Sequence, residues 1–205
     1  MSPARTLRLR PEFLGLAIVM LVVGCAAPGA SSAPTTTGPP AVPRGWQSVA
    51  SDPGDVRLAL PPDIPVMFTE VGIMAWLPLI DGALQFELLA VGPGDVSPQP
   101  ASGEDLGSWL ERSEWVPRAG DPSYVAVTPA SVTEVDLAAG RALEVDVTGD
   151  PGLPNAVRVV VYAIETGDGI AIIRLVGDPQ LMEERAGELR LVAMLAEFGG
   201  LDEPR

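Results

Sequence analysis

Residues 156–176 read AVRVVVYAIETGDGIAIIRLV, two runs rich in β-branched residues on either side of Gly167 and Gly169. Runs of this composition around a glycine-containing turn predict a β-hairpin, with strands at 156–164 and 170–176. Apolar residues occupy the positions on both faces of each strand, as is typical of strands that are covered above and below. The hairpin therefore predicts a sheet with other elements packed on both of its faces.

The preceding hairpin carries a row of acidic residues. The segments VTEVDL (132–137) and ALEVDV (142–147) alternate as strands around AAG, which we interpret as a three-residue loop with Gly140 in a left-handed conformation. This register pairs Leu137 with Arg141 and Val135 with Leu143, and it places Glu134 directly opposite Glu144. Asp136 and Asp146 share their face.

Like charges directly opposite each other destabilise a sheet. If residues 165–167 also form a three-residue loop, Arg158 opposes Arg174 on the next hairpin. The arginines of this hairpin and the carboxylates of the preceding one could then reduce each other's charge repulsion. We therefore expect Arg158 or Arg174 to lie within salt-bridge reach of Glu144 or Asp146. The alternative is a calcium site, but calcium takes six to eight oxygen ligands and a strand pair offers side-chain oxygens only, so we expect no metal site.

The first half of the domain predicts shorter strands and one helix. Strands are expected at 46–50, 56–60, 67–71, 73–77 and 84–91, with SDPGD (51–55) as the turn of a first hairpin. Ser102 is expected to cap a helix whose apolar stripe contains Leu106, Trp109 and Leu110, and Pro117 marks its end.

A closing helix follows the second long hairpin. Asp178 is its expected N-cap, with Pro179 in the first position and Gly199-Gly200 as the stop. Its apolar residues recur at spacings of four and three and are expected to pack on the sheet: Met182, Ala186, Leu189, Ala193 and Ala196. The order of strands, helix, two hairpins and helix predicts an α+β fold with a mainly antiparallel sheet packed by helices.

Four segments carry a resemblance to the PsbP-like family: DVRLALP (55–61), AAGRALEVDV (138–147), RVVVYAIETGDGIAIIRLVGDP (158–179) and LAEF (195–198). This family includes a photosystem extrinsic protein, a Ran-binding import factor and many bacterial lipoproteins. The resemblance implies a PsbP-like α+β domain. It implies no activity, because the four segments are patterns of apolar residues and turns.

The N-terminus has the features of a secretory signal. Three arginines (Arg5, Arg8 and Arg10) precede an apolar run at 13–23, which is shorter than the roughly 20 residues that a spanning helix needs. The next residues, Val22-Val23-Gly24-Cys25, resemble the lipobox of bacterial lipoproteins. The resemblance implies a signal peptide at 1–24 and a diacylglycerol on the sulfur of Cys25, the mature N-terminus.

Cys25 is the only cysteine, so the alternatives are a buried thiol or an intermolecular disulfide. We favour lipid attachment, because Cys25 stands between the apolar run and a segment rich in Pro, Ala, Ser and Thr. Residues 25–45 are then the lipidated cysteine and a linker, which cannot bury enough apolar surface to fold. Residues 46–205 form the domain, held at the extracytoplasmic face of the cell membrane by the lipid anchor.

Composition excludes several functions. The formal charge is −14 and becomes −16 once a signal with three arginines and one glutamate is removed, which argues against binding nucleic acid. The chain has no histidine, the commonest general base and metal ligand, and it lacks G-x-S-x-G and phosphate-loop motifs. We expect no enzyme and no cofactor. A hydrolase built on two carboxylates is a distant third hypothesis.

Two hypotheses for the function remain. The first is a non-catalytic lipoprotein that presents an acidic domain to a protein or envelope partner, and it predicts a filled interior with an exposed apolar patch. The second is a module that binds a small molecule or lipid in an enclosed cavity between sheet and helix. Trp46, Trp76, Trp109 and Trp115 could line such a groove, although core packing is the favoured interpretation.

Overall fold

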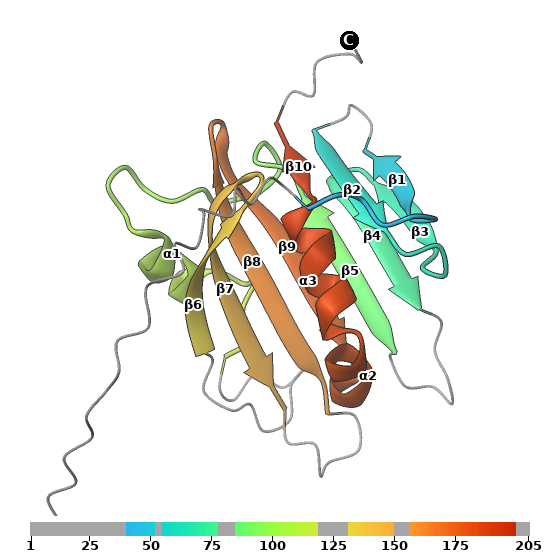
Figure 1. The fold of residues 1–205 in the computed structure, drawn as a ribbon. Helices are drawn as coiled ribbons and strands as arrows, with labels where there is room; N and C mark the ends of the chain where they lie inside the picture. Colours follow the sequence, from blue (N-terminus) through green and yellow to red (C-terminus); the bar gives the residue numbers. More distant parts are fainter. Residues whose placement is uncertain (1–39, 52–54, 78–84, 119–130, 150–155, 200–205) are drawn as a thin grey trace, which may run out of the picture. The chain divides into compact units, whose positions relative to one another are not determined.

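The computed structural model describes residues 40–51, 55–77, 85–118, 131–149 and 156–199, all within one compact unit. Two antiparallel sheets and three helices make up this part of the chain (Figure 1). The smaller sheet has the order β1-β2-β10, from Gln47–Ala50, Val56–Leu60 and Glu197–Phe198. None of the helices in these segments is long and apolar enough to cross a bilayer.

The larger sheet has seven strands in the order β3-β4-β5-β9-β8-β7-β6. In chain order, these strands are β3 (Val66–Thr69), β4 (Gly72–Leu77), β5 (Phe86–Val91), β6 (Ser131–Leu137), β7 (Gly140–Thr148), β8 (Arg158–Thr166) and β9 (Gly169–Gly177). The helices are α1 (Leu106–Arg112), α2 (Pro179–Glu184) and α3 (Ala186–Met194). Strands β8 and β9, the hairpin that the sequence indicates most strongly, lie inside the sheet, each with a strand on either side.

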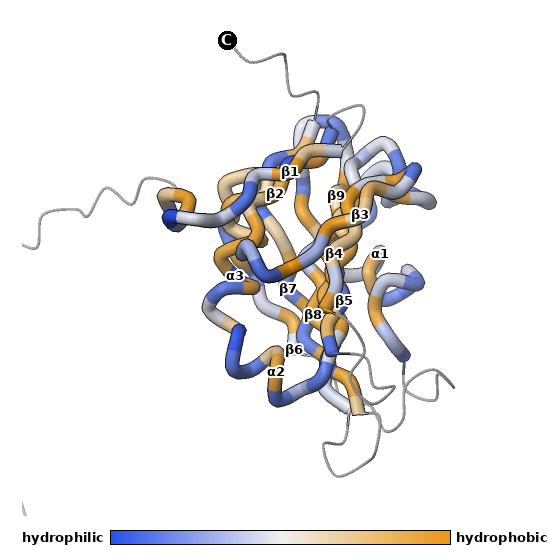
Figure 2. Tube along the Cα trace, turned by 90° about the vertical axis from the view of Figure 1, so that its right-hand side faces the viewer, coloured by the Kyte–Doolittle hydropathy of each residue, from blue (hydrophilic) through white to orange (hydrophobic). Residues whose placement is uncertain are grey.

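Both faces of the seven-stranded sheet are covered over β8 and β9, as the sequence predicts. On one side, which we call the α3 face, strand residues such as Tyr162 and Ile173 pack with Leu189 and Val192 of α3 and with β2. On the other side, the α1 face, Val161 and Ile172 pack with Trp109 and Leu110. Figure 2 shows α1 on one side of the sheet and α2, α3, β1 and β2 on the other. The α+β architecture is therefore confirmed.

The predicted register of the acidic hairpin is wrong by one residue. Leu137 pairs with Gly140, so Ala138 and Ala139 form a two-residue loop. Gly140 has a φ of 151°, and a Cβ there would lie 2.1 Å from the carbonyl oxygen of Glu165, so the close approach of β8 requires glycine within the strand. Glu134 therefore pairs with Leu143, on the opposite face from Glu144.

The second hairpin loop is also shorter than predicted. Thr166 pairs with Gly169, so Arg174 lies opposite Val161 and does not oppose Arg158. The expected ion pair is nevertheless confirmed, because Arg158 Nη2 lies 2.6 Å from Asp146 Oδ2. Arg158 Nη1 also reaches Glu183 of α2 at 2.6 Å. The hydrogen bonds to Asp146 and Glu183 raise the pKa of Arg158, so this group on the α3 face stays charged.

The helix boundaries correct two expectations. The N-cap of α1 is Asp105 rather than Ser102, because its carboxylate accepts hydrogen bonds from the backbone N–H and the hydroxyl of Ser108. The helix ends at Arg112, before Pro117. Its expected apolar residues, Leu106, Trp109 and Leu110, are all buried.

The closing helix is divided at Arg185. This residue has φ −101° and ψ 8°, outside the helical range, and its guanidinium binds Asp63 at 3.0 Å and Glu188 at 2.7 Å. Asp178 caps α2 as predicted, by accepting from Leu181 N–H. The helical stretch ends before Ala196, and Glu197–Phe198 pairs with β2 as the short strand β10. Of the expected stripe, all but the half-buried Ala186 are buried: Met182, Leu189, Ala193 and Ala196.

Candidate binding surface

Large apolar side chains are exposed at one hairpin of the domain. Met67 is 45% exposed, Phe68 57% and Val71 42%. They account for three of the five exposed large hydrophobic residues found in the part of the chain that the structure describes, and they fall within five consecutive positions. We call Met67, Phe68 and Val71 the β3 patch. Clustered exposed apolar residues indicate an interaction site more strongly than scattered ones do.

The patch is exposed because β3 is the last strand of the larger sheet. Met67 pairs with Met74 on the α1 face, whereas Phe68 pairs with the buried Ile73 on the α3 face, so the two side chains leave the strand in opposite directions. The hairpin is held tightly. Thr69 Oγ1 donates to the carbonyl of Gly72 at 3.1 Å, and a Cβ on Gly72 would lie 2.0 Å from the oxygen of Ala90 in β5. The Thr69 hydrogen bond closes the turn that joins β3 to β4, and the close approach to β5 requires glycine at position 72.

Sequence reasoning missed this surface. It assigned 67–71 to a strand and 73–77 to the next one, which is nearly right, but it did not identify which strand would lie at the edge. The available signal was the run PVMFTEV (65–71), in which apolar residues are adjacent rather than separated by polar ones. From sequence alone, a strand with apolar residues on both faces is predicted to be buried, because its position in the sheet is not known.

The tryptophans differ in how deeply they are buried. Trp109 is buried among the residues of the α1 face, and its Nε1 donates to the carbonyl of Pro98 at 2.9 Å. Trp46 and Trp115 are half-buried. Trp46 packs against the core on the α3 face, and Trp115 packs against the core on the α1 face. Core packing, the favoured interpretation, is thus confirmed for Trp109. Two of the four, Trp109 and Trp115, also line a hollow.

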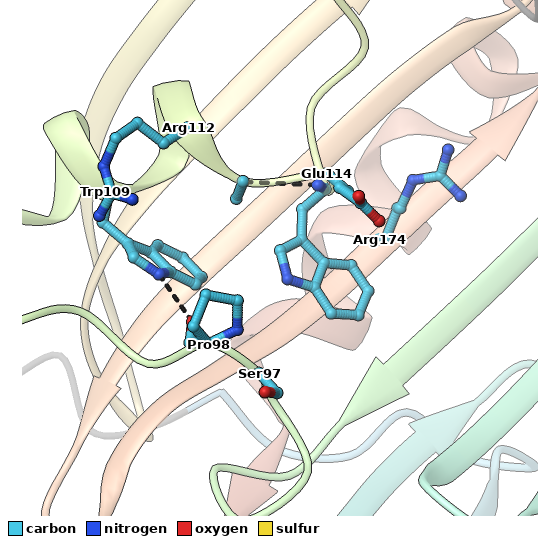
Figure 3. Close-up of a pocket in the computed structure, with 8 residues that line it drawn as sticks. Ser97, Pro98, Trp109, Arg112, Glu114 and Arg174 are labelled. Atoms are coloured by element: carbon cyan, nitrogen blue, oxygen red, sulfur yellow. Dashed lines mark hydrogen bonds between the residues drawn. The ribbon is translucent and has the colours of Figure 1, made fainter.

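This hollow lies between α1 and the sheet and has a volume of about 480 Å³ (Figure 3). Its walls mix indole rings with polar and charged groups: Ser97, Pro98, Trp109, Arg112, Ser113, Glu114, Trp115 and Arg174. Arg112 binds Glu104, and this bond, with another from the N–H of Ala101, lowers the pKa of the Glu104 carboxyl. The hollow is open to solvent and mixed in character, so it is not the enclosed apolar cavity that a lipid-binding module requires.

Three acidic residues of the long hairpins, Glu134, Glu144 and Asp146, lie beside partners. Besides the Arg158–Asp146 pair, Arg141 Nη2 binds Glu134 at 2.7 Å across β6 and β7. Burial raises the pKa of the Tyr162 phenol, and the carboxylate of Glu144 opposite it on β7 adds to the effect. Within the described segments, no group of three or more acidic or cysteine side chains is arranged to hold a metal ion.

Calcium should therefore leave the protein unchanged. We expect millimolar CaCl₂ to leave the melting temperature unmoved, because Asp146 already has a cation in Arg158 and strand geometry supplies few further oxygens. Differential scanning fluorimetry with and without CaCl₂ is the measurement. An upward shift that Glu144→Gln abolishes would make the α3 face a metal site.

Cys25, the signal at 1–24 and most of the linker lie outside the described residues, so lipid attachment stays a prediction. The turn residues Pro53-Gly54 and the expected strand start at Leu84 also lie outside them. Residues 40–45, the described end of the linker, contain no helix or strand, and regular structure begins at Gln47.

Comparisons with known proteins give structural likenesses only. No family profile and no curated protein matches the chain. Cyanobacterial PsbP from Synechocystis aligns with 83% of this chain and 100% of its own at 11% identity, with a TM-score of 0.49. LpqN, involved in cell envelope biogenesis of Mycobacterium tuberculosis, aligns with 76% of this chain and 91% of its own at 13% identity, with a TM-score of 0.45.

A third solved structure, the Saccharomyces cerevisiae Ran-binding protein Mog1p, covers 75% of this chain and 95% of its own at 12% identity, with a TM-score of 0.42. These likenesses are loose. The α+β assignment rests on the strand order and the two buried layers described above.

Proposed function

We propose that this chain is a non-catalytic, membrane-anchored lipoprotein that presents an acidic extracytoplasmic domain to protein or envelope partners. The observation that carries the proposal is the β3 patch on a domain whose sheet is packed on both faces. A filled interior with an exposed apolar surface is what a binding platform requires. The proposal includes no catalysis, in keeping with a chain that has no histidine.

The N-terminal sequence supports the anchored location. A short apolar run ends at Val22-Val23-Gly24-Cys25, and a linker rich in Pro, Ala, Ser and Thr follows it. A diacylglycerol on Cys25 supplies the two acyl chains that stable membrane anchoring requires. The linker then spaces the folded domain from the bilayer, because proline-rich segments favour extended conformations.

Site-specific photo-crosslinking in intact cells tests the binding role. A photoreactive phenylalanine analogue is placed at Phe68 in the β3 patch or at Val132, which is 60% exposed on the opposite edge of the sheet. We expect at least one position to give a discrete adduct with another envelope component. Absence of adducts from both positions, with the protein correctly exported, would contradict the proposed function.

The second candidate function, a small-molecule module, is favoured by the hollow beside α1. Its volume of about 480 Å³ is within the usual range for ligand sites, and Trp109 and Trp115 would offer ring surfaces. This function would require ligand-induced changes in tryptophan fluorescence that Trp115→Ala reduces, since Trp109 also lines the hollow. We place it second because Arg112 at the rim is already engaged by Glu104.

A further inference from the structure

We infer that the edge strand β3 binds by β-strand addition and that its partner is an extended, basic segment of another protein. This inference rests on the proposed function and specifies how its surface works. In strand addition, a peptide continues the sheet through backbone hydrogen bonds, and side chains on alternate positions provide selectivity. Three features support it: within the described residues β3 pairs with β4 alone, its four residues carry no charge, and the sequence around it is acidic.

The backbone pairing of β3 shows which of its groups face outward. Trp76 N donates to the carbonyl of Pro65 at 3.2 Å, and hydrogen-bonded pairs alternate along an antiparallel ladder. Met67–Met74 and Thr69–Gly72 are therefore the bonded pairs with β4. The N–H and C=O groups of Val66 and Phe68 point away from β4, toward the edge where an added strand would lie.

The two edges of the larger sheet differ in protection. Edge strands are normally protected from pairing by charged residues, prolines or bulges. At the far edge, β6 carries Glu134 and Asp136, and Arg141 of β7 binds Glu134. In contrast, β3 reads VMFT, with no charge and with two exposed large apolar side chains, Met67 and Phe68. Among the residues that the structure describes, β3 is therefore the edge strand of the larger sheet without charged side chains, and its four residues make it a short edge.

Charge identifies the kind of partner. The sequence from Leu58 to Glu111, which contains β3, β4 and β5, has no basic residue. It has eight acidic residues, of which Glu70 lies in the β3–β4 turn and Glu87 on β5, whereas Asp63 and Glu104 are already paired with Arg185 and Arg112. A second copy of this acidic chain would be repelled at the same edge, whereas a segment rich in Lys or Arg would be attracted. A basic strand with apolar residues on alternate positions therefore fits best.

Fluorescence anisotropy with a labelled peptide of alternating Val and Lys tests the inference on the full-length protein. We expect saturable binding that weakens as salt rises, because the attraction is partly electrostatic. A peptide of alternating Val and Glu should not bind. The Val-Lys peptide with an N-methyl group on every residue should also fail, since neither of its edges can then donate backbone hydrogen bonds.

Two substitutions at Phe68 separate side chain from backbone. Phe68→Ala removes the ring and keeps the N–H, whereas Phe68→Pro also removes an outward-facing N–H that β4 does not use. The loss of one hydrogen bond corresponds to about a 2- to 10-fold weakening, so Phe68→Pro should bind that much more weakly than Phe68→Ala. Val132→Ala on the protected edge is the matched control and should bind as the native protein does.

Three outcomes would overturn the inference: no preference for Val-Lys over Val-Glu, full binding of the N-methylated peptide, or a dimer in analytical ultracentrifugation that Phe68→Pro abolishes. The N-methylated peptide keeps the test decisive even if Phe68→Pro does not fold. Crosslinking from Val132 but not from Phe68 would refute strand addition and leave the proposed function standing. Crosslinking from neither position would refute the proposed function itself.

Discussion

Replacing Leu189 by alanine is expected to lower the free energy of unfolding by about 2–5 kcal/mol, the usual cost of truncating a large aliphatic side chain in a core. Leu189 is 4% exposed and belongs to the cluster on the α3 face that also contains Leu58 of β2 and Ile173 of β9. It therefore links a helix to both sheets. Its loss leaves a cavity among residues that cannot easily collapse, because three elements hold them apart.

Chemical denaturation followed by circular dichroism measures this effect. Arg190→Ala is the control, since Arg190 is exposed on the same helix and surface substitutions usually change stability by less than about 0.5 kcal/mol. A midpoint for Leu189→Ala equal to that of the control would show that α3 is peripheral and that the α3 face is not one core with the sheet.

The sequence predicted the architecture better than the register. Periodicity identified the long strands and buried residues such as Leu106 and Leu189, because burial on one or both faces leaves a direct pattern in the sequence. The loop length of the β6–β7 hairpin was wrong because Gly140 was assigned to the turn. Its positive φ is real, but the reason for glycine is the Glu165 carbonyl of the neighbouring strand, a contact distant in sequence.

Long-range pairing also explains the other errors. Residues 195–198 continue the helical pattern, yet Glu197 pairs with Arg57 in β2, and Arg57 Nη1 binds the Glu197 carboxylate at 2.9 Å. Similarly, the division of the closing helix occurs where Arg185 binds Asp63, a residue 122 positions away. Local propensity contains no information about such partners.

The candidate site was only partly accessible from the sequence. The expectation of an exposed apolar patch could be stated, but its location could not, because Met67 and Phe68 are exposed only through the place of β3 in the strand order. The hollow beside α1 brings together Ser97, Trp115 and Arg174, which lie in separate parts of the chain. Two of the four tryptophans named in advance do line it.

The second large effect is expected at Cys25. Replacing it by serine removes the only sulfur nucleophile of the chain that could carry a diacylglycerol. Each buried methylene contributes about 0.8 kcal/mol to membrane binding, so the loss of two acyl chains should convert a stably bound protein into a released one. The domain has no compensating attraction, because its formal charge is strongly negative and anionic headgroups repel it.

Serine at position 25 differs from cysteine by one atom, so the folded domain beyond residue 45 should be unaffected. Thermal unfolding of the released Cys25→Ser protein checks this point, with the detergent-extracted native protein as its reference. A matched control is Ser31→Ala, which changes the linker without touching the lipobox and should leave membrane association intact.

Metabolic labelling with a palmitate analogue, combined with membrane fractionation, tests the lipoprotein assignment most directly. The native protein and Ser31→Ala should be labelled and should sediment with the membranes, whereas Cys25→Ser should be unlabelled and absent from the washed membrane fraction as a mature protein. Equal labelling of Cys25→Ser and the native protein would contradict the assignment of Cys25 as the site of lipid attachment, and with it the anchored platform proposed for this domain.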